Sequence, residues 1–245
     1  MRLSRIFVTQ PLREGARILL DQDSSHYLRN VLRLKPGVLV TLFNGDDCYD
    51  YESLLSYQGK QAIAVIQQRT VGTTESALST EIIQGLSRSD HMDWMIQKMT
   101  ELGVKGISVF NAEHSQIPLK QKQRDKRLAH WQAVAIKACE QSGRYRPPQI
   151  VFHQSLAEVL EDSIVRDVRI LLDFEGCRLQ DIPVNADAAQ HISILPGPEG
   201  GLSKAEIKLA RASGFIPTRL GPRVLRTETA AVTALAIVQS TWGDI

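Results

Sequence analysis

Hydrophobic and polar positions follow one pattern in the first third of the chain and another in the rest. The first 72 residues hold short β-prone runs, at 5–8, 38–43 and 62–67. The Asn-Gly-Asp-Asp sequence at 44–47 is typical of a tight turn between strands. One short helix is predicted to begin near Ser24 or Ser25, which can cap it, and to end before Pro36. This part of the chain therefore predicts a small β-rich domain.

The polar stretch 70–80 shows no periodicity and predicts a boundary, with domains at 1–72 and 73–245. After it, apolar runs alternate with helical periodicity. Strands are predicted at 82–83, 107–110, 150–152, 168–172 and 192–195. Helix faces are formed by Met92, Met95, Ile96, Met99 and Leu102, and by Leu128, Trp131, Ala135 and Ala138. This alternation predicts an α/β fold with a parallel sheet and helices on both faces.

Composition narrows the class of protein. With 29 Lys and Arg, 27 Asp and Glu and 43% apolar residues, the net charge of +2 excludes a histone-like tail and an acidic disordered chain. No run approaches the roughly 18 apolar residues of a membrane span, and charges interrupt residues 2–17, so we expect a cytoplasmic protein without a membrane partner. Three cysteines without C-x-x-C spacing and six histidines without ligand spacing predict no metal site.

The charge is distributed unevenly. Residues 82–150 carry a net +5 and residues 151–245 a net −3, so an anionic partner is expected on the middle segment. The basic run 119–127 suits phosphate contacts, although a solvated helix face explains it too. The candidate RNA-binding residues are Arg5, Arg29, Arg33, Lys120, Lys122, Arg124, Lys126 and Arg127.

Two segments near the end of the chain are candidates for chemistry. The predicted strand 192–195 leads into a loop with Gly197, Gly200 and Gly201, followed by the capping-box pair Ser203 and Glu206. Glycines at the carboxyl end of a parallel strand let backbone groups approach a ligand, but the spacing matches no phosphate-binding motif. A purely structural turn explains the spacing equally well.

The second segment, 220–230, places Arg223 and Arg226 before a helix that is apolar almost all round. Thr227 and Glu228 suit the start of that helix as caps. The arginines are not explained by capping. A helix of this kind is buried in a core or against a second subunit.

Five strings, in this order, resemble the RsmE family of 16S ribosomal RNA (uracil-N3)-methyltransferases of the SPOUT class: HYLRNVLRLKPG, KMTELGV, EQSGRYRPP, LPGPEGGLS and LGPRVLRTETA. The resemblance implies a PUA-like β-barrel that binds RNA at 1–72 and a SPOUT α/β domain with a deep trefoil knot at 73–245. It also implies a homodimer, S-adenosyl-L-methionine as methyl donor, and the RNA of the small subunit, as an assembled 30S particle, as substrate. His114 stands where the family is expected to have arginine.

The resemblance further implies three loops around the methyl donor. Their cofactor-binding residues are Leu172, Phe174, Glu175, Gly197, Glu199, Gly200, Gly201, Leu220, Gly221 and Leu225. Methylation at N3 requires an unpaired or flipped uridine that loses its N3 proton. The expected catalytic residues are Arg223, Arg226 and Arg144, for charge stabilisation, and Glu228, as proton acceptor.

Several alternatives stay open at this point. Glu228 could only cap its helix while the proton leaves to water. The chain could also be another SPOUT enzyme, acting on transfer RNA or a ribose 2′-hydroxyl. A non-catalytic RNA-binding protein of ribosome assembly is a third alternative.

Overall fold

The computed structural model describes residues 4–115, 118–162, 168–182 and 191–245. The chain folds into two compact units. The first unit consists of the residues up to Glu75 together with Cys139–Pro147, and the second consists of Ser76–Ala138 and Pro148–Ile245. The single boundary expected between residues 72 and 73 therefore misses one feature, because a later segment of nine residues packs with the first unit.

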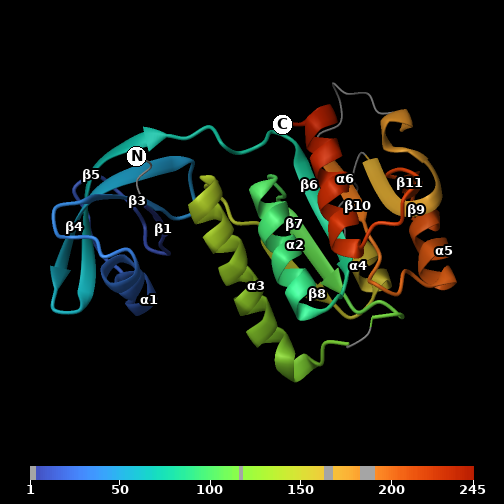
Figure 1. Cartoon of the computed structure of the whole chain (residues 1–245), viewed down its shortest axis with the longest axis horizontal. Coiled ribbons are helices and arrows are strands. Elements are labelled where there is room, and N and C mark those ends of the chain that lie inside the picture. Colours follow the sequence, from blue (N-terminus) through green and yellow to red (C-terminus); the bar gives the residue numbers. More distant parts are fainter. Residues whose placement is uncertain (1–3, 116–117, 163–167, 183–190) are drawn as a thin grey trace. The chain divides into compact units, whose positions relative to one another are not determined.

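The first unit is built on one five-stranded sheet, in the order β1-β3-β4-β5-β2. Figure 1 shows strands β3, β4 and β5 of this sheet in blue and cyan. Its strands are β1 (Arg5–Phe7), β2 (Arg17–Leu19), β3 (Leu39–Phe43), β4 (Tyr49–Gln58) and β5 (Gln61–Val71). Strands β1 and β3 are parallel, and the other pairs are antiparallel. The expected turn at 44–47 lies between β3 and β4. The core contains Ile6, Leu28, Val40, Leu42 and Leu55.

The short helix of this unit begins earlier than expected. Helix α1 (Gln22–His26) is capped by Asp21, whose Oδ1 accepts from the Ser24 N–H at 2.7 Å. Ser24 and Ser25 are buried inside the helix instead of capping it. A π-helical turn, η1 (Tyr27–Val31), follows directly.

The second unit contains a six-stranded sheet in the order β11-β9-β10-β6-β7-β8, and every pair in it is parallel, as the alternation predicted. The strands are β6 (Ser79–Gly85), β7 (Gly106–Phe110), β8 (Gln149–His153), β9 (Val168–Arg178), β10 (His191–Leu195) and β11 (Ile216–Arg219). The helices are α2 (Ser89–Glu101), α3 (Gln121–Ser142), α4 (Leu156–Asp162), α5 (Lys204–Ala212) and α6 (Thr227–Trp242), with a 3₁₀ turn, η2, at Leu179–Asp181.

Helices cover both faces of this sheet. Neighbouring strand residues point to opposite faces, so Ile82 joins the core under α2, α3 and α6, whereas Ile83 joins the core under α4 and α5. The methionines of α2 lie in the first of these cores, as the helical spacing predicted. Strand β11 was not predicted, because it is short and contains Pro217, which is tolerated at the edge of a sheet. No helix in the described parts is long and apolar enough to span a membrane.

Candidate functional site

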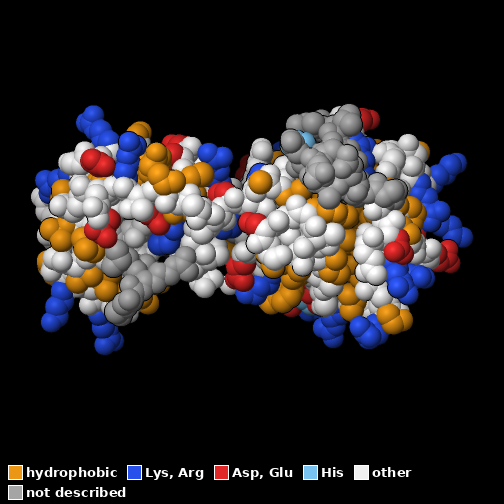
Figure 2. Space-filling model, turned by 90° about the horizontal axis from the view of Figure 1, so that it is seen from above, with side chains coloured by type: hydrophobic (Ala, Val, Ile, Leu, Met, Phe, Trp, Pro, Cys, Tyr) orange, Lys and Arg blue, Asp and Glu red, His pale blue; other side chains and the backbone are white. Residues whose placement is uncertain are grey.

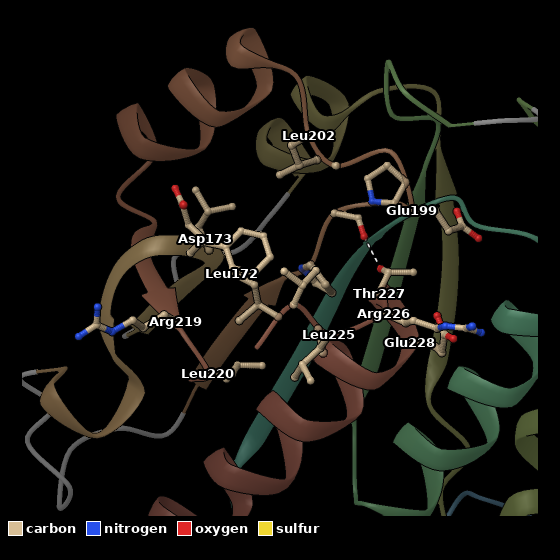
Figure 3. A pocket seen from close by; sticks show the side chains of 18 of the residues that line it. Leu172, Asp173, Glu199, Leu202, Arg219, Leu220, Leu225, Arg226, Thr227 and Glu228 are labelled. Carbon is tan, nitrogen blue, oxygen red and sulfur yellow. Dashed lines mark hydrogen bonds between the residues drawn. The ribbon is translucent and has the colours of Figure 1, made fainter. Parts of the chain in front are cut away.

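A pocket of about 780 Å³ lies in the second unit at the carboxyl ends of β10 and β11. Three segments supply most of its wall: residues 171–174 of β9, residues 196–202 after β10, and residues 218–230, which lead from β11 into α6 (Figure 3). We call residues 196–202 the glycine loop. Parallel strands present their carboxyl ends on one edge of a sheet, and open α/β folds bind ligands at that edge.

The predicted cofactor residues meet at this pocket, with one exception. Its lining includes Leu172, Phe174, Gly197, Glu199, Gly200, Gly201, Leu220, Gly221 and Leu225. Glu175 is exposed and does not line it; its backbone N–H donates to Asp173 Oδ1 at 3.1 Å, and Asp173 lines the wall there.

Local chemistry holds the glycine loop close to its neighbours. Gly201 has a φ of +73°, which favours glycine, and a Cβ on Gly200 would lie 2.9 Å from both Cβ and the carbonyl oxygen of His114. The predicted capping box starts α5: Ser203 Oγ accepts from the Glu206 N–H at 3.2 Å, and Glu206 Oε2 accepts from the Ser203 N–H at 2.8 Å. The glycine loop is therefore held at Gly200, by its close approach to His114, and after its last residue, by the capping box of α5.

A buried glutamine ties the glycine loop to the start of α6. Gln84, at the end of β6, is fully buried, and its Nε2 donates to the Gly197 carbonyl at 3.2 Å and to Thr227 Oγ1 at 3.3 Å. The Thr227 hydroxyl donates to the same carbonyl. No side chain caps α6, so capping is not the role of Thr227 in this structure.

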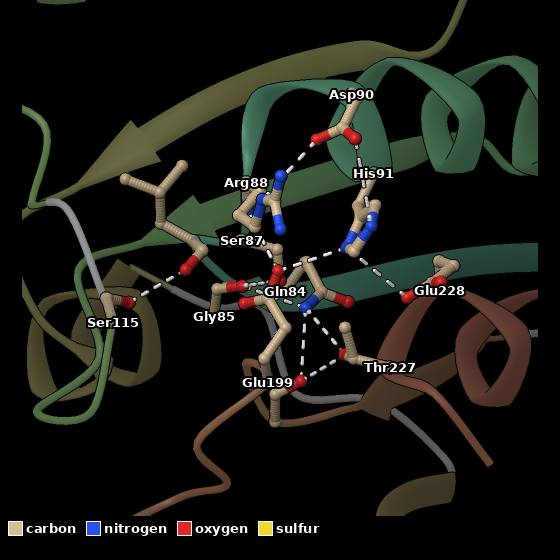
Figure 4. A network of polar contacts seen from close by, with 12 residues as sticks. Gln84, Gly85, Ser87, Arg88, Asp90, His91, Ser115, Glu199, Thr227 and Glu228 are labelled. Atoms are coloured by element: carbon tan, nitrogen blue, oxygen red, sulfur yellow. Dashed lines mark hydrogen bonds and ion pairs between the residues drawn. The ribbon is translucent and has the colours of Figure 1, made fainter.

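An imidazole and two carboxylates form a cluster in the wall of the pocket (Figure 4). His91 Nδ1 lies 3.1 Å from Glu199 Oε1 and 3.7 Å from Glu228 Oε2. Glu199 Oε1 also accepts from the Arg88 backbone N–H at 3.0 Å. Burial favours the neutral form of Glu199, but hydrogen bonds from the Arg88 and Glu199 backbones, His91 and Ser87 hold its pKa below the usual range. Glu199 is therefore ionised at neutral pH.

The expected catalytic residues divide into two groups. Arg223, Arg226 and Glu228 line the pocket, with both arginines exposed. Arg144 does not: it belongs to the first unit, is 3% exposed, and its Nη2 lies 2.9 Å from Glu75 Oε2. Its guanidinium is held in a buried ion pair, and the assignment of Arg144 as a catalytic residue stays a prediction.

One expected RNA contact also has a structural role. Arg5 is 8% exposed, pairs with Asp50 Oδ1 at 2.8 Å, and stacks over the rings of Phe43 and Tyr145. A guanidinium enclosed in this way has a structural role in the first unit, and an RNA contact of Arg5 stays a prediction. The other candidates lie at or near the surface, on η1 and the turn after it, just before α3, or in the first two turns of α3: Arg29, Arg33, Lys120, Lys122, Arg124, Lys126 and Arg127.

The first unit has a hollow of its own, of about 580 Å³. Its lining residues are all polar and include no carboxylate: Gln22, Ser25, His26, Arg29, Asn30, Lys60 and Gln61. The Arg29 side chain donates to the Gly59 carbonyl and lies 5.6 Å from the centre of the Tyr57 ring. This hollow suits a polar, anionic ligand.

Sequence reasoning missed Gln84, Arg88 and His91. Gln84 lies at the end of β6, and Arg88 and His91 follow that strand. Strand β6 was predicted, so a search of the residues at its carboxyl end could have found all three. Within the described parts of the chain, no group of three or more His, Cys, Asp and Glu side chains is arranged to hold a metal ion.

Comparisons with known proteins agree with this geometry. A family model described as an RNA methyltransferase domain matches residues 74–239. Similar curated proteins are the ribosomal RNA small subunit methyltransferase E of Buchnera aphidicola subsp. Schizaphis graminum, 29% identical over 100% of this chain and 98% of the relative, and that of Bacillus subtilis, 27% identical over 94% and 92%.

Two solved structures are similar over the full length of both chains. One is a methyltransferase from Legionella pneumophila in complex with S-adenosylmethionine, with a TM-score of 0.94 and 32% identity. The other is a ribosomal RNA small subunit methyltransferase E from Neisseria gonorrhoeae bound to S-adenosylmethionine, with a TM-score of 0.90 and 32% identity. The chain thus belongs to the RNA methyltransferase domain family and, within it, to the ribosomal RNA small subunit methyltransferase E (RsmE) family.

Proposed function

We propose that this protein transfers a methyl group from S-adenosylmethionine to N3 of a uridine in the RNA of the small ribosomal subunit. The observation that carries the proposal is the pocket at the carboxyl ends of β10 and β11, which three separate segments line. Full-length similarity to two methyltransferase structures with bound S-adenosylmethionine supports the choice of methyl donor.

The pocket residues fit S-adenosylmethionine, which carries no phosphate and combines an apolar adenosine part with a charged methionine part. Leu172, Leu202, Leu220 and Leu225 offer apolar contacts. Backbone groups of the glycine loop are open to an approaching ligand. Glu199 Oε2 and Glu228 Oε2 are buried and have no hydrogen-bond partner among the described residues, and their negative charge suits a cationic ligand. When bound, S-adenosylmethionine supplies a methyl group activated on a sulfonium sulfur.

The exposed side of the pocket matches the pairing edge of uracil. On this edge an N3–H group lies between two carbonyl oxygens. The Glu228 carboxylate, which lines the pocket, is our candidate to accept the N3 proton. The Arg223 and Arg226 guanidinium groups, from the same lining, are our candidates to stabilise the negative charge that the two carbonyl oxygens then share. Deprotonation leaves a lone pair on N3 that would form the bond to the methyl group as the methyl carbon–sulfur bond breaks, leaving a neutral thioether.

Single-turnover methylation of small-subunit RNA tests these roles. We expect Glu228→Gln and Arg226→Ala each to slow the step by about 10²-fold or more, the usual effect of losing one acid–base or oxyanion contact. Glu161→Gln and Arg178→Ala are matched controls, because both residues are exposed and lie outside the pocket lining. Normal rates in folded Glu228→Gln and Arg226→Ala proteins would refute both assignments.

We propose that RNA binds through cations of both units. Support comes from the carboxylate-free hollow around Arg29 and Lys60 in the first unit, and from the exposed basic residues just before and within the start of α3. Lysine and arginine side chains project freely from the first unit in Figure 2. Phosphate contacts of this kind weaken as salt displaces them.

Reversing charge at Lys122 and Arg124 tests the α3 contact. The double substitution to Glu should weaken RNA binding and flatten its salt dependence while leaving S-adenosylmethionine binding intact. The matched control is Lys204→Glu with Lys208→Glu, since these exposed lysines lie on α5. An unchanged salt slope would mean that the basic run is only solvated.

The same proposal includes the finer features of the family: a PUA-like barrel in the first unit, a deep trefoil knot in the second, a homodimer and a cytoplasmic location with the ribosomal subunits. Support for the dimer comes from α6, where Val232, Ile237 and Trp242 stay only partly buried within one chain. Apolar side chains also reach the surface of the second unit in Figure 2. Light scattering after size exclusion tests the dimer, and an experimental backbone trace tests the barrel and the knot.

A further inference from the structure

His91 lies between two carboxylates that come from different segments of the chain. It stands in the first turn of α2, Glu199 belongs to the glycine loop, and Glu228 stands in the first turn of α6. Side-chain exposure is 22% for His91, 19% for Glu199 and 12% for Glu228, so water screens these contacts only partly. The only other carboxylate facing the ring among the described residues is Asp90, which lies 3.9 Å from Nε2 and is well exposed.

The partners of Nδ1 fix where the imidazole carries a hydrogen. Glu199 is ionised and can only accept, so the 3.1 Å contact to its Oε1 requires a hydrogen on Nδ1. The same nitrogen is the one that faces Glu228. His91 therefore cannot receive a proton from Glu228 at Nδ1; it donates to Glu199, and its N–H side lies 3.7 Å from Glu228 as an electrostatic contact.

The contact to His91 bears on the orientation of Glu228. The Oε2 atom of Glu228 is buried and makes no hydrogen bond within the described residues, and His91 Nδ1 lies 3.7 Å from it. Glu199 has a second anchor, the Arg88 N–H at 3.0 Å. The imidazole is thus held firmly on the side of the glycine loop and reaches from there toward Glu228 (Figure 4).

We propose that His91 is a positioning residue that transmits the position of the glycine loop to Glu228, so that S-adenosylmethionine binding and the alignment of the proton acceptor are coupled. The inference rests on the proposed function, in which Glu228 accepts the N3 proton. It goes beyond that function by assigning the coupling to one side chain. A ligand that fixes the position of the Glu199 side chain also fixes the His91 ring. The His91 ring in turn fixes the position of the Glu228 carboxylate, which faces the substrate base.

Kinetics of four proteins test the coupling: the wild type, His91→Ala, Glu228→Gln and the double variant. Because His91 acts through Glu228, His91→Ala should lower kcat by about tenfold or more in the wild type and by less than about twofold in the Glu228→Gln background. His91→Asn keeps an N–H donor near the position of Nδ1 and should recover most of the lost kcat. A purely structural histidine would show neither pattern.

Calorimetric binding of S-adenosylmethionine without RNA supplies the second readout. His91→Ala should weaken binding several-fold in the wild type and by less in a Glu199→Gln background, where the contact between the two side chains is already altered. His130→Ala is the matched control: its Nε2 lies 2.8 Å from Asp93 Oδ2, a comparable pair in the same unit but outside the pocket.

Failure of the inference and failure of the proposed function give different results. Absence of methyl transfer by the wild-type protein would overturn the proposed function. An active wild type whose His91→Ala and Glu228→Gln losses multiply, or whose His91→Ala variant keeps full kcat and affinity, would overturn only the role of His91.

Discussion

Gly200→Ala is the substitution that probes the glycine loop most sharply. Its added Cβ would lie 2.9 Å from the Cβ and from the carbonyl oxygen of His114. Ordinary carbon contacts begin near 3.5 Å, so the two segments must separate by about half an ångström. A backbone oxygen cannot rotate away as a side chain can. The glycine loop, with Glu199 next in sequence, has to move.

Overpacking of this size costs about 1–3 kcal/mol. If that cost falls on the arrangement that binds S-adenosylmethionine, affinity should drop by about 5- to 150-fold. Isothermal titration calorimetry measures the affinity, and thermal unfolding checks that the variant is folded at the assay temperature.

Gly214→Ala is the control for this experiment. Gly214 has a φ of +84° and no atom within 4 Å of its added Cβ, and it does not line the pocket. Alanine there should cost about 1 kcal/mol of stability through the backbone and leave binding unchanged. A Gly200→Ala protein that binds S-adenosylmethionine as tightly as the wild type would refute the close packing of loop and His114.

Two further predictions concern the first unit and the thiols. Glu75→Gln should lower the free energy of unfolding by about 3–5 kcal/mol at neutral pH, because it removes the carboxylate that pairs with Nη2 of buried Arg144. Burial opposes ionisation of Glu75, but Arg144 and the Tyr145 and Arg146 N–H groups hold its pKa below the usual range. The stabilisation is thus present above the ordinary glutamate pKa and is lost as pH falls through the lowered pKa of Glu75. Urea unfolding should therefore show that the difference in free energy of unfolding between the wild type and Glu75→Gln disappears in acid. A difference that stays constant with pH would contradict this. Exposed Cys177 should react first with a thiol reagent and Cys139 last, since burial raises the pKa of Cys139 to about 12. Peptide mapping after brief labelling distinguishes the two cysteines. Early modification of Cys139 would contradict its burial and show that its site opens.

Local sequence patterns were sufficient to predict the parallel sheet, apart from its edge strand β11, and to single out the glycine loop. Strand periodicity, the glycines and the Ser203–Glu206 capping box act within a few residues, so their consequences can be read along the chain. The resemblance to the RsmE family added the segment of β9 and gave the stretch before α6, already a candidate from its residues, a role in binding the methyl donor. The pocket brings these segments together at residues far apart in sequence.

The burial of charged residues was not predicted, because residue type does not determine burial. Arg144 and Arg5 were chosen as cations for RNA chemistry, yet each is enclosed with a carboxylate partner, Glu75 or Asp50. Arg144 belongs to the segment 139–147, and Arg5 contacts that segment through the Arg144 carbonyl and the Tyr145 ring; no local pattern indicated that this segment packs with residues 1–75. His91 was missed for the opposite reason: it lies alone in sequence, and only folding brings Glu199 and Glu228 beside it.

The central claim is tested most directly by methylating small ribosomal subunits taken from a strain that lacks this activity. Purified protein with S-adenosylmethionine should produce 3-methyluridine at one position of the small-subunit RNA, identified by nucleoside mass spectrometry and mapped by nuclease digestion. Omitting S-adenosylmethionine should abolish the product. No methylated nucleoside on subunits or on their free RNA, or a methyl group on a ribose or on another base, would contradict the proposed function.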